Sequence, residues 1–203
     1  MTHINLFGKF FQLKNNPDRV MKLRIGLIIQ VRLCVSFIFV ISIAIAASGC
    51  TSEAVKRAET LVKVTSTPHF KSSYDLMNTG VIQHLDRDYT YDIIPSELVG
   101  GLLFQGIHRP PKGTALKIEL LEPATIYFFF HHTVDGGYTK IFKTLNSWKK
   151  CNTAPQYDID NGDHGLKMTM YKMEANKGIY HIPPTQEDRA CFNIVFVYDD
   201  QVL

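Results

Sequence analysis

The stretch "ATIYFFFHH", residues 124–132, decides the fold. It is a run of β-branched and aromatic residues that begins after Glu122-Pro123 and ends before Asp135-Gly136-Gly137. Residues of this kind fit the pleated surface of a β-strand, whereas Pro, Asp and Gly are turn residues. A short apolar run bounded by turn residues is typical of a strand buried in a sheet. We therefore predict a central strand here.

Similar segments surround this strand. "ALKIELL" (115–121) alternates apolar with charged residues, as expected of a strand with one buried face. Further segments with strand character are 88–94, 101–107, 164–173, 177–182 and 191–200. Turn residues separate them, and only 138–150 has the character of a helical turn. Short strands with regular turns predict an all-β antiparallel β-sandwich of the jelly-roll or galactose-binding-like type.

Composition excludes one class of partner. The chain has 203 residues, 45% hydrophobic and 20% charged, which is an ordinary globular composition. The formal net charge is +3, but six of the 22 basic residues and only one of the 19 acidic residues precede residue 51, so the remaining chain is near −2. Binding to phosphate backbones depends on clustered Lys and Arg. We therefore do not expect nucleic acid as a partner.

The first fifty residues have the order of an export signal. "LCVSFIFVISIAIAASG" (33–49) is an apolar run without charge, preceded by basic residues and closed by small ones. We predict that residues 1–49 are a signal peptide with a long n-region, in which Met21 would be a more ordinary start. This segment would form a signal or anchor helix ahead of the sandwich.

The end of this segment is more specific. Ala47-Ser48-Gly49-Cys50 resembles the lipobox of bacterial lipoproteins, which implies cleavage before Cys50 and attachment of a lipid to it. An ordinary secretory cut after Gly49 and an uncleaved anchor with its N-terminus inside are the alternatives. The apolar run is at the short limit for a membrane span, which favours cleavage. We expect a protein of the cell envelope or extracellular space, lipid-anchored at the membrane.

The exported part divides into a tether and one domain. Residues 50–80 begin with a possible short helix and continue as a Ser/Thr/Lys-rich spacer, so we predict a tether. Residues 81–203 would form the β-sandwich, with enough chain for one core. Once Cys34 leaves with the signal and Cys50 carries the lipid, Cys151 and Cys191 remain. An exported domain could pair these two in a disulfide bond.

Three segments carry a family resemblance: "DRDYTYDIIPSELVGG" (86–101), "PATIYFFF" (123–130) and "LNSW" (145–148). They resemble the small β-sandwich domains attached to secreted bacterial polysaccharide lyases and glycoside hydrolases. The matching positions are Tyr89, Tyr91, Pro95, Leu98, Gly100, Pro123, Tyr127, Trp148, Tyr171 and Gly178. The chain departs from that pattern before Trp148, where the Pro is absent, and after Gly178, where Gly-Gly-Asn is absent. The resemblance implies a fold and an accessory role near glycans, not an enzymatic activity.

Aromatic residues are candidates for sugar binding, because exposed rings offer flat apolar faces to the CH-rich side of a sugar. Trp148 and Tyr138 lie outside the clear strands, and we take them, with His132 and Asp135, as candidate ligand-binding residues. The alternative, favoured for Trp148, is an anchor or lid of the hydrophobic core.

A calcium site is a weaker candidate. In "YDIDNGDHG" (157–165), Asp158, Asp160 and Asp163 place oxygen ligands close together. The glycine falls one place early for an EF-hand loop, however, and Asn161-Gly162 is the strongest short signal for a hairpin turn. We favour the hairpin and expect no other cofactor.

Histidines at the end of the central strand raise the question of catalysis. His131 and His132 point to opposite faces of a strand, so the two imidazoles cannot readily share a metal. One of them could join His164 or His181 across strands; the favoured alternative is that both are solvated. A small hydrolase or lyase would use His131 or His132 with Asp135, but no familiar catalytic motif is present.

The functional expectation is therefore a non-catalytic binding domain at the cell surface. Carbohydrate is the first ligand to consider, and a protein partner is the next. A small secreted enzyme and a purely structural envelope protein are the alternatives.

Overall fold

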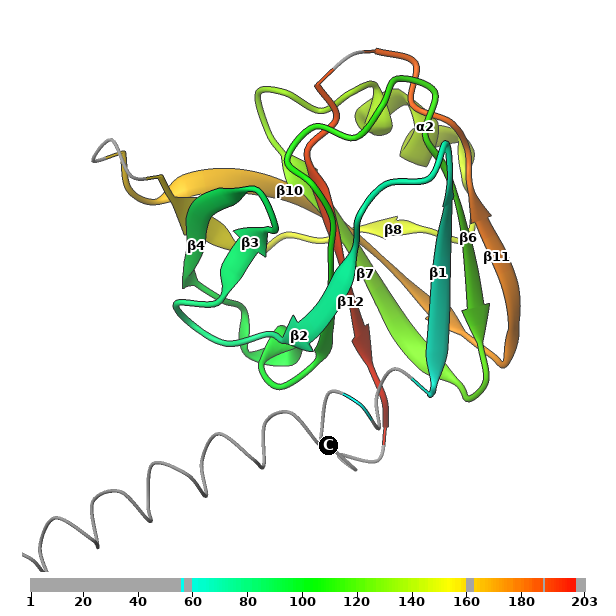
Figure 1. Ribbon diagram of the computed structural model, residues 1–203. Helices are drawn as coiled ribbons and strands as arrows, with labels where there is room; N and C mark the ends of the chain where they lie inside the picture. The colour runs from blue at the N-terminus through cyan, green and yellow to red at the C-terminus, as the bar shows by residue number, and fades with distance from the viewer. Residues whose placement is uncertain (1–55, 57–59, 160–162, 188, 200–203) are drawn as a thin grey trace, which may run out of the picture. The chain divides into compact units, whose positions relative to one another are not determined.

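Two antiparallel sheets account for most of the computed structural model, which describes residues 56, 60–159, 163–187 and 189–199 (Figure 1). The predicted signal segment, Cys50 and Asp160 lie outside these residues. In the described part of the chain, no helix combines the length and hydrophobicity needed to cross a bilayer. The all-β sandwich predicted from the sequence is confirmed.

The strands are β1 (Val62–Thr67), β2 (Ser73–Leu76), β3 (Ile82–His84), β4 (Arg87–Ile93), β5 (Leu102–Gln105), β6 (Ala115–Leu120), β7 (Ala124–His131), β8 (Lys149–Lys150), β9 (Gln156–Asp158), β10 (Leu166–Ala175), β11 (Gly178–Ile182) and β12 (Phe192–Val197). A 3₁₀ turn, η3 (Ser96–Leu98), follows β4, and the helix α2 (Tyr138–Thr144) follows β7 inside the segment where a helical turn was predicted.

The smaller sheet has the order β1-β6-β11. In its central strand β6, Leu116, Ile118 and Leu120 are buried, and the residues between them are less so. This is the alternation that the sequence predicts for a strand with one buried face. Leu120 pairs with Val62 of β1 on one side and Gly178 of β11 on the other.

The larger sheet has the order β2-β5-β12-β7-β10-β9-β4-β3, and β8 also pairs with β10. This sheet curls until its β3 end returns to β5, next to its other end. The backbone N–H of Leu85, just after β3, donates to the carbonyl oxygen of Gly106, just after β5, at 3.0 Å. The side-chain amide of Gln105 also donates to the carbonyl oxygen of Ile82. The curl encloses a second interior, separate from the space between the sheets.

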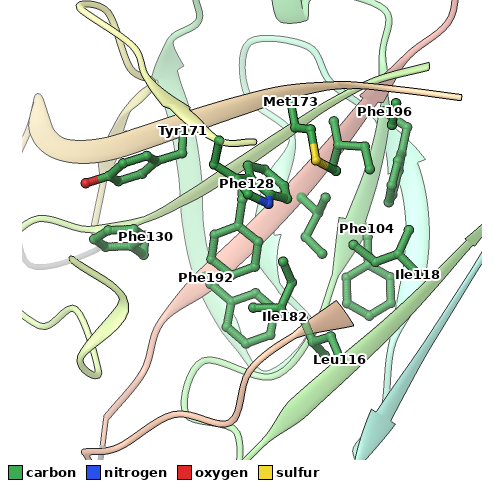
Figure 2. Packing of buried hydrophobic residues seen from close by; sticks show 14 of the residues in the cluster. Phe104, Leu116, Ile118, Phe128, Phe130, Tyr171, Met173, Ile182, Phe192 and Phe196 are labelled. Carbon is green, nitrogen blue, oxygen red and sulfur yellow. The ribbon is translucent and has the colours of Figure 1, made fainter. Parts of the chain in front are cut away.

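The first interior is the apolar core of the sandwich, between the small sheet and the central strands of the large one (Figure 2). Ile126, Phe128 and Phe130 of β7 point into it. The ring of Phe128 stacks on that of Phe192, with centroids 5.2 Å apart and planes 15° apart. Offset ring pairs of this kind add to the stabilisation from buried area.

The second interior lies on the opposite face of the same strands. Tyr127 and Phe129 of β7, Met170 of β10, Val195 of β12 and Tyr91 of β4 line it. Because successive residues of a strand point to opposite faces, β7 supplies both interiors in turn. Its double-sided burial explains why residues 124–131 are apolar without alternation.

The structure corrects one predicted boundary. Part of the predicted tether, residues 50–80, forms strands β1 and β2, which belong to the two sheets. Both lie at an edge of their sheet, and β1 alternates buried or half-buried residues with exposed ones. Edge strands carry polar residues on their open side. That polar content is why the segment has the composition of a spacer.

Candidate functional site

A group of buried histidines occupies one end of the second interior, together with a cysteine. His131 is the last residue of β7 and follows Tyr127 and Phe129 on the same face. Cys191 immediately precedes β12, His84 ends β3, and His108 lies in the loop after β5. Their exposed fractions are 4% for His131, 1% for Cys191, 0% for His84 and 6% for His108.

Three of these residues converge. One potential ligand atom from each of His108, His131 and Cys191 lies within 4.8 Å of the others, and we call this set the His-Cys cluster. His84 lies beside the cluster, with its ring centroid 5.2 Å from that of His108 and 5.8 Å from that of His131. Nitrogen and sulfur atoms within this distance of one another are close enough for one transition-metal ion to bind them.

The His131 ring is held in place by its neighbours. Its Nε2 shares a hydrogen bond of 2.8 Å with Oε1 of Gln83, and its face stacks on Tyr157 with centroids 4.3 Å apart. The backbone carbonyl of Gln83 in turn accepts a hydrogen bond of 2.8 Å from the Asn193 side chain. These contacts join β3, β7, β9 and β12, so the curl of the sheet fixes the orientation of this imidazole.

Cys191 is positioned by a close approach between two loops. Gly136, at φ +59°, packs against Ala190, where a Cβ would come within 2.3 Å of the alanine Cβ. Any larger residue at position 136 would push this loop away. The Cys191 carbonyl also accepts a hydrogen bond of 3.1 Å from the backbone N–H of His131, which ties two members of the cluster together.

Several buried polar atoms next to this space have no partner within the described residues. They are Nδ1 and Nε2 of His84 and Nδ1 of His108. A buried polar group without a hydrogen bond costs about 1–3 kcal/mol of stability. Native interiors rarely keep such groups, and each one calls for an explanation such as a bound water, a bound ion or a chemical role. The arrangement therefore presents free nitrogen lone pairs inside the protein.

The electrostatics keep the imidazoles neutral. Burial, followed by neighbouring cationic groups, lowers the pKa of His84 from 6.5 to about 2. The same causes lower the pKa of His131 to about 3 and also lower that of His108. Burial raises the pKa of the Cys191 thiol to about 12, although the nearby Arg109 acts in the opposite direction. Neutral imidazole is the form that binds metals, and a coordinated metal removes the thiol proton.

The predicted catalytic combination is not assembled. His131 points into the second interior, whereas His132 is exposed and its Nδ1 lies 3.0 Å from Oγ1 of Thr169. The Asp135 carboxylate accepts hydrogen bonds from the backbone N–H groups of Gly137 and Thr139, at 2.9 and 3.3 Å. These hydrogen bonds hold the turn that leads into helix α2, whose N-cap is Gly137. The expectation that His131 is solvated was wrong, because the curl of the sheet covers it.

The predicted aromatic platform lies in the sandwich core. Tyr138 is 0% exposed and Trp148 is 8% exposed, and both pack around Phe128. This is the core position that the sequence favours for Trp148. Neither ring offers a free face to a sugar.

The predicted disulfide bond does not form. Cys151 and Cys191 are free. Cys191 precedes β12 and Cys151 follows β8, and the strand order β12-β7-β10-β8 places three strand spacings between them. Three spacings amount to about 14 Å, whereas a disulfide needs Cα atoms within about 7 Å. The disulfide was predicted from the number of remaining cysteines, and that number says nothing about the distance between them in the fold.

In the segment 157–165, the candidate calcium site, the Asp158 carboxylate is bonded to groups of the protein itself. Asp158 accepts a hydrogen bond of 2.8 Å from the backbone N–H of Gly165 and pairs with Nδ1 of His164 at 2.8 Å. The Gly165 hydrogen bond, then His164, lowers the pKa of Asp158, and Asp158 raises that of His164. Asp163 is exposed. His164 is thus a partner of this carboxylate, and His181 lies on β11 of the other sheet, so neither joins His131.

Comparison with known proteins adds to the fold. The sequence matches no protein-family model and no curated protein. One similar solved structure is a beta-glucuronidase from glycoside hydrolase family 2, with a TM-score of 0.50 and 14% identity over 68% of this chain and 14% of that one. Another is a GH138 enzyme targeting pectin rhamnogalacturonan II, with a TM-score of 0.45 and 14% identity over 68% of this chain and 16% of that one.

The beta-glucuronidase contains a region whose fold is similar to that of this chain. The chain spans about a seventh of the length of each of these two enzymes. A likeness at this level of identity concerns the fold, and the chemistry of a site has to be argued from its own residues.

Proposed function

We propose that this chain is an exported, lipid-anchored β-sandwich domain that binds a transition-metal ion at the His-Cys cluster. The observation that carries the proposal is the convergence of His108, His131 and Cys191 within 4.8 Å in a buried space. In this cluster Nδ1 of His108 has no hydrogen-bond partner within the described residues, whereas His131 is bonded to Gln83 and the Cys191 thiol donates to the carbonyl oxygen of Arg189 at 3.5 Å. A buried polar atom without a partner destabilises the domain. Coordination of an ion satisfies the lone pairs and offsets that cost.

The neighbours of His131 hold its ring as the neighbours of a metal-binding histidine do. Ligating histidines usually donate their second ring nitrogen to a neighbouring acceptor, which fixes the tautomer. Gln83 provides this acceptor for Nε2 of His131. Because Nε2 is engaged, we assign Nδ1 of His131 to the ion.

The proposed location of the protein depends on its first fifty residues. The apolar run 33–49 and Cys50 support export and lipid attachment, and the free Cys151 and Cys191 are compatible with a metal ligand rather than a disulfide. Replacement of Cys50 by Ser should move the protein out of the membrane fraction. A Cys50→Ser protein that stays in that fraction would exclude acylation.

The test of metal binding is equilibrium dialysis of the full chain in detergent. Separate samples are dialysed against Zn(II), Co(II) and Cu(I), the last under anaerobic conditions, and metal content is measured by mass spectrometry. We expect a single ion per chain for at least one metal, lost in Cys191→Ser and kept in the matched control Cys151→Ser. Equal retention by both variants would contradict the proposal.

Glycan binding is the second candidate, and the fold likeness to part of a beta-glucuronidase favours it. Because Trp148 and Tyr138 are buried, a sugar would need another surface. A hollow of about 600 Å³ lined by Glu97, Tyr198 and Asp199, among others, offers acidic acceptors for hydroxyl groups. A glycan array probed with the wild type and Glu97→Gln tests this candidate, and a blank array for the wild type would remove it.

A further inference from the structure

We propose that the ion is monovalent copper, held by Sγ of Cys191 and one ring nitrogen from each of His108 and His131. This inference rests on the proposed function and specifies the metal. On binding, the S–H bond of Cys191 breaks, a sulfur–copper bond forms and the proton leaves to solvent. The copper keeps its oxidation state, so no oxidant or reductant is needed.

The first argument is the softness of the donors. The cluster offers one sulfur and two imidazole nitrogens and contains no carboxylate. Thiolate and thioether ligands select Cu(I) and Zn(II), whereas carboxylates and carbonyls suit harder ions such as Mg²⁺ and Ca²⁺. A second sulfur lies nearby, because Met168 pairs with His131 in register and its Sδ is 3.7 Å from Nε2 of Gln83. This donor set restricts the choice to soft and borderline ions.

The second argument is the number of ligands. Structural zinc sites are almost always tetrahedral and closed by four protein ligands. Here three ligand atoms converge, and His84 lies beside them without joining the convergent set. A zinc ion would therefore need either a shift of His84 or a water molecule in a deeply buried space. Cu(I) is satisfied by three soft donors.

The third argument is charge. Arg87 pairs with Asp86 at 3.6 Å, and Asp86 also accepts a hydrogen bond of 2.7 Å from the backbone N–H of His108. Arg109 follows His108 directly, and no salt bridge to it occurs within the described residues. A Zn(II)-thiolate unit would keep a net positive charge close to this arginine. A Cu(I)-thiolate unit is neutral, which is favourable in a buried space where uncompensated charge is costly.

The test compares the two metals on the same protein. The full chain in detergent is titrated anaerobically with Cu(I) against a chromogenic Cu(I) chelator, and in parallel with Zn(II) against a zinc chelator. Ag(I) serves as a redox-inert monovalent probe. We expect Cu(I) and Ag(I) to be retained. Cys191→Ser should weaken Cu(I) binding by more than about 100-fold, because loss of a residue that only hydrogen-bonds to a ligand typically costs about 10–100-fold.

Two variants separate the outcomes. Cys151→Ser should bind Cu(I) as the wild type does, and circular dichroism confirms that both cysteine variants are folded. His84→Gln should change Cu(I) affinity by less than about threefold, because Cys191, His108 and His131 alone coordinate the ion. Loss of a residue that hydrogen-bonds to a ligand would cost about 10–100-fold. Zn(II) could instead bind as tightly as Cu(I) in competition, with its binding abolished in His84→Gln. The ion would then be zinc with four ligands, so the copper inference would fail and the proposed function would stand. If no metal is retained by the wild type, both fail.

Discussion

The two faces of the central strands differ in what they enclose. On one face, Phe128 and its neighbours fill the space between the sheets with aromatic and aliphatic groups (Figure 2). On the other face, the curled sheet begins with an apolar lining around Phe129 and ends in buried histidines whose nitrogens lack partners. The first interior stabilises the fold. The second contains unpartnered ring nitrogens of His84 and His108, and the hydroxyl of Tyr138 in the first interior has no partner within the described residues either. What sets the second interior apart is the convergence of His108, His131 and Cys191, on which the proposed metal site rests.

The largest effect should come from the apolar face. Phe128→Ala removes a fully buried ring from the centre of the sandwich core and should lower the free energy of unfolding by about 3–5 kcal/mol. Chemical denaturation followed by circular dichroism measures this. Lys117→Ala, on the exposed side of β6, is the control and should stay within about 0.5 kcal/mol. A Phe128→Ala loss no larger than that of the control would contradict the assignment of the main core.

The second effect is a pH dependence of the unfolding free energy, which the buried His84 should cause. His84 has a folded pKa of about 2, below its ordinary 6.5, so the unfolded state binds more protons as the pH falls below 6.5. Of the groups that face it, Arg87 is cationic, whereas His108 and His131 have lowered pKa values of their own and compete with His84 for a proton. Stability of the metal-free protein should therefore fall by about 2 kcal/mol through His84 between pH 7 and pH 5.

The variant His84→Leu isolates this contribution. Its unfolding free energy should depend less steeply on pH than that of the wild type, with both measured in the presence of a chelator. Identical slopes would show that His84 titrates normally and is not buried in a neutral form.

A third effect should have the opposite sign to that of Phe128→Ala. In metal-free protein at pH 7, His84→Leu replaces two unpartnered nitrogens with apolar atoms and should raise the free energy of unfolding by about 1 kcal/mol. Thermal unfolding with a chelator measures the change. A large loss of stability would mean that the His84 nitrogens have partners and that the second interior is an ordinary satisfied core.

The smallest effect concerns the cysteines. Because Cys151 and Cys191 are free, a reductant should leave the unfolding temperature of the metal-free protein unchanged. Removal of a native disulfide would typically cost about 2–5 kcal/mol. A clear drop in unfolding temperature on reduction, together with the absence of free thiols in the untreated protein, would restore the disulfide.

Local patterns in the sequence were enough for the sandwich core. The alternation in 115–121 and the apolar run in 124–132 both report burial directly, because side-chain direction repeats every two residues. Strands β1 and β2 were missed because edge strands carry polar residues and resemble spacers. The turn into α2 was found from Asp135-Gly136-Gly137.

The His-Cys cluster was not predictable in the same way. Its members are far apart in sequence and meet because the end of the curled sheet returns to β5, which no local pattern encodes. One signal was present in the sequence. His131 continues the face occupied by Tyr127 and Phe129, so the alternation of β7 already placed this imidazole inside if the strand was buried on both sides.

X-ray absorption spectroscopy of the Cu(I)-loaded full chain tests the metal assignment most directly. The account predicts a copper ion coordinated by one sulfur and two imidazole nitrogens, with the sulfur contribution lost in Cys191→Ser and kept in Cys151→Ser. A spectrum with only nitrogen and oxygen ligands in the wild type, or one that is the same in both cysteine variants, would contradict it.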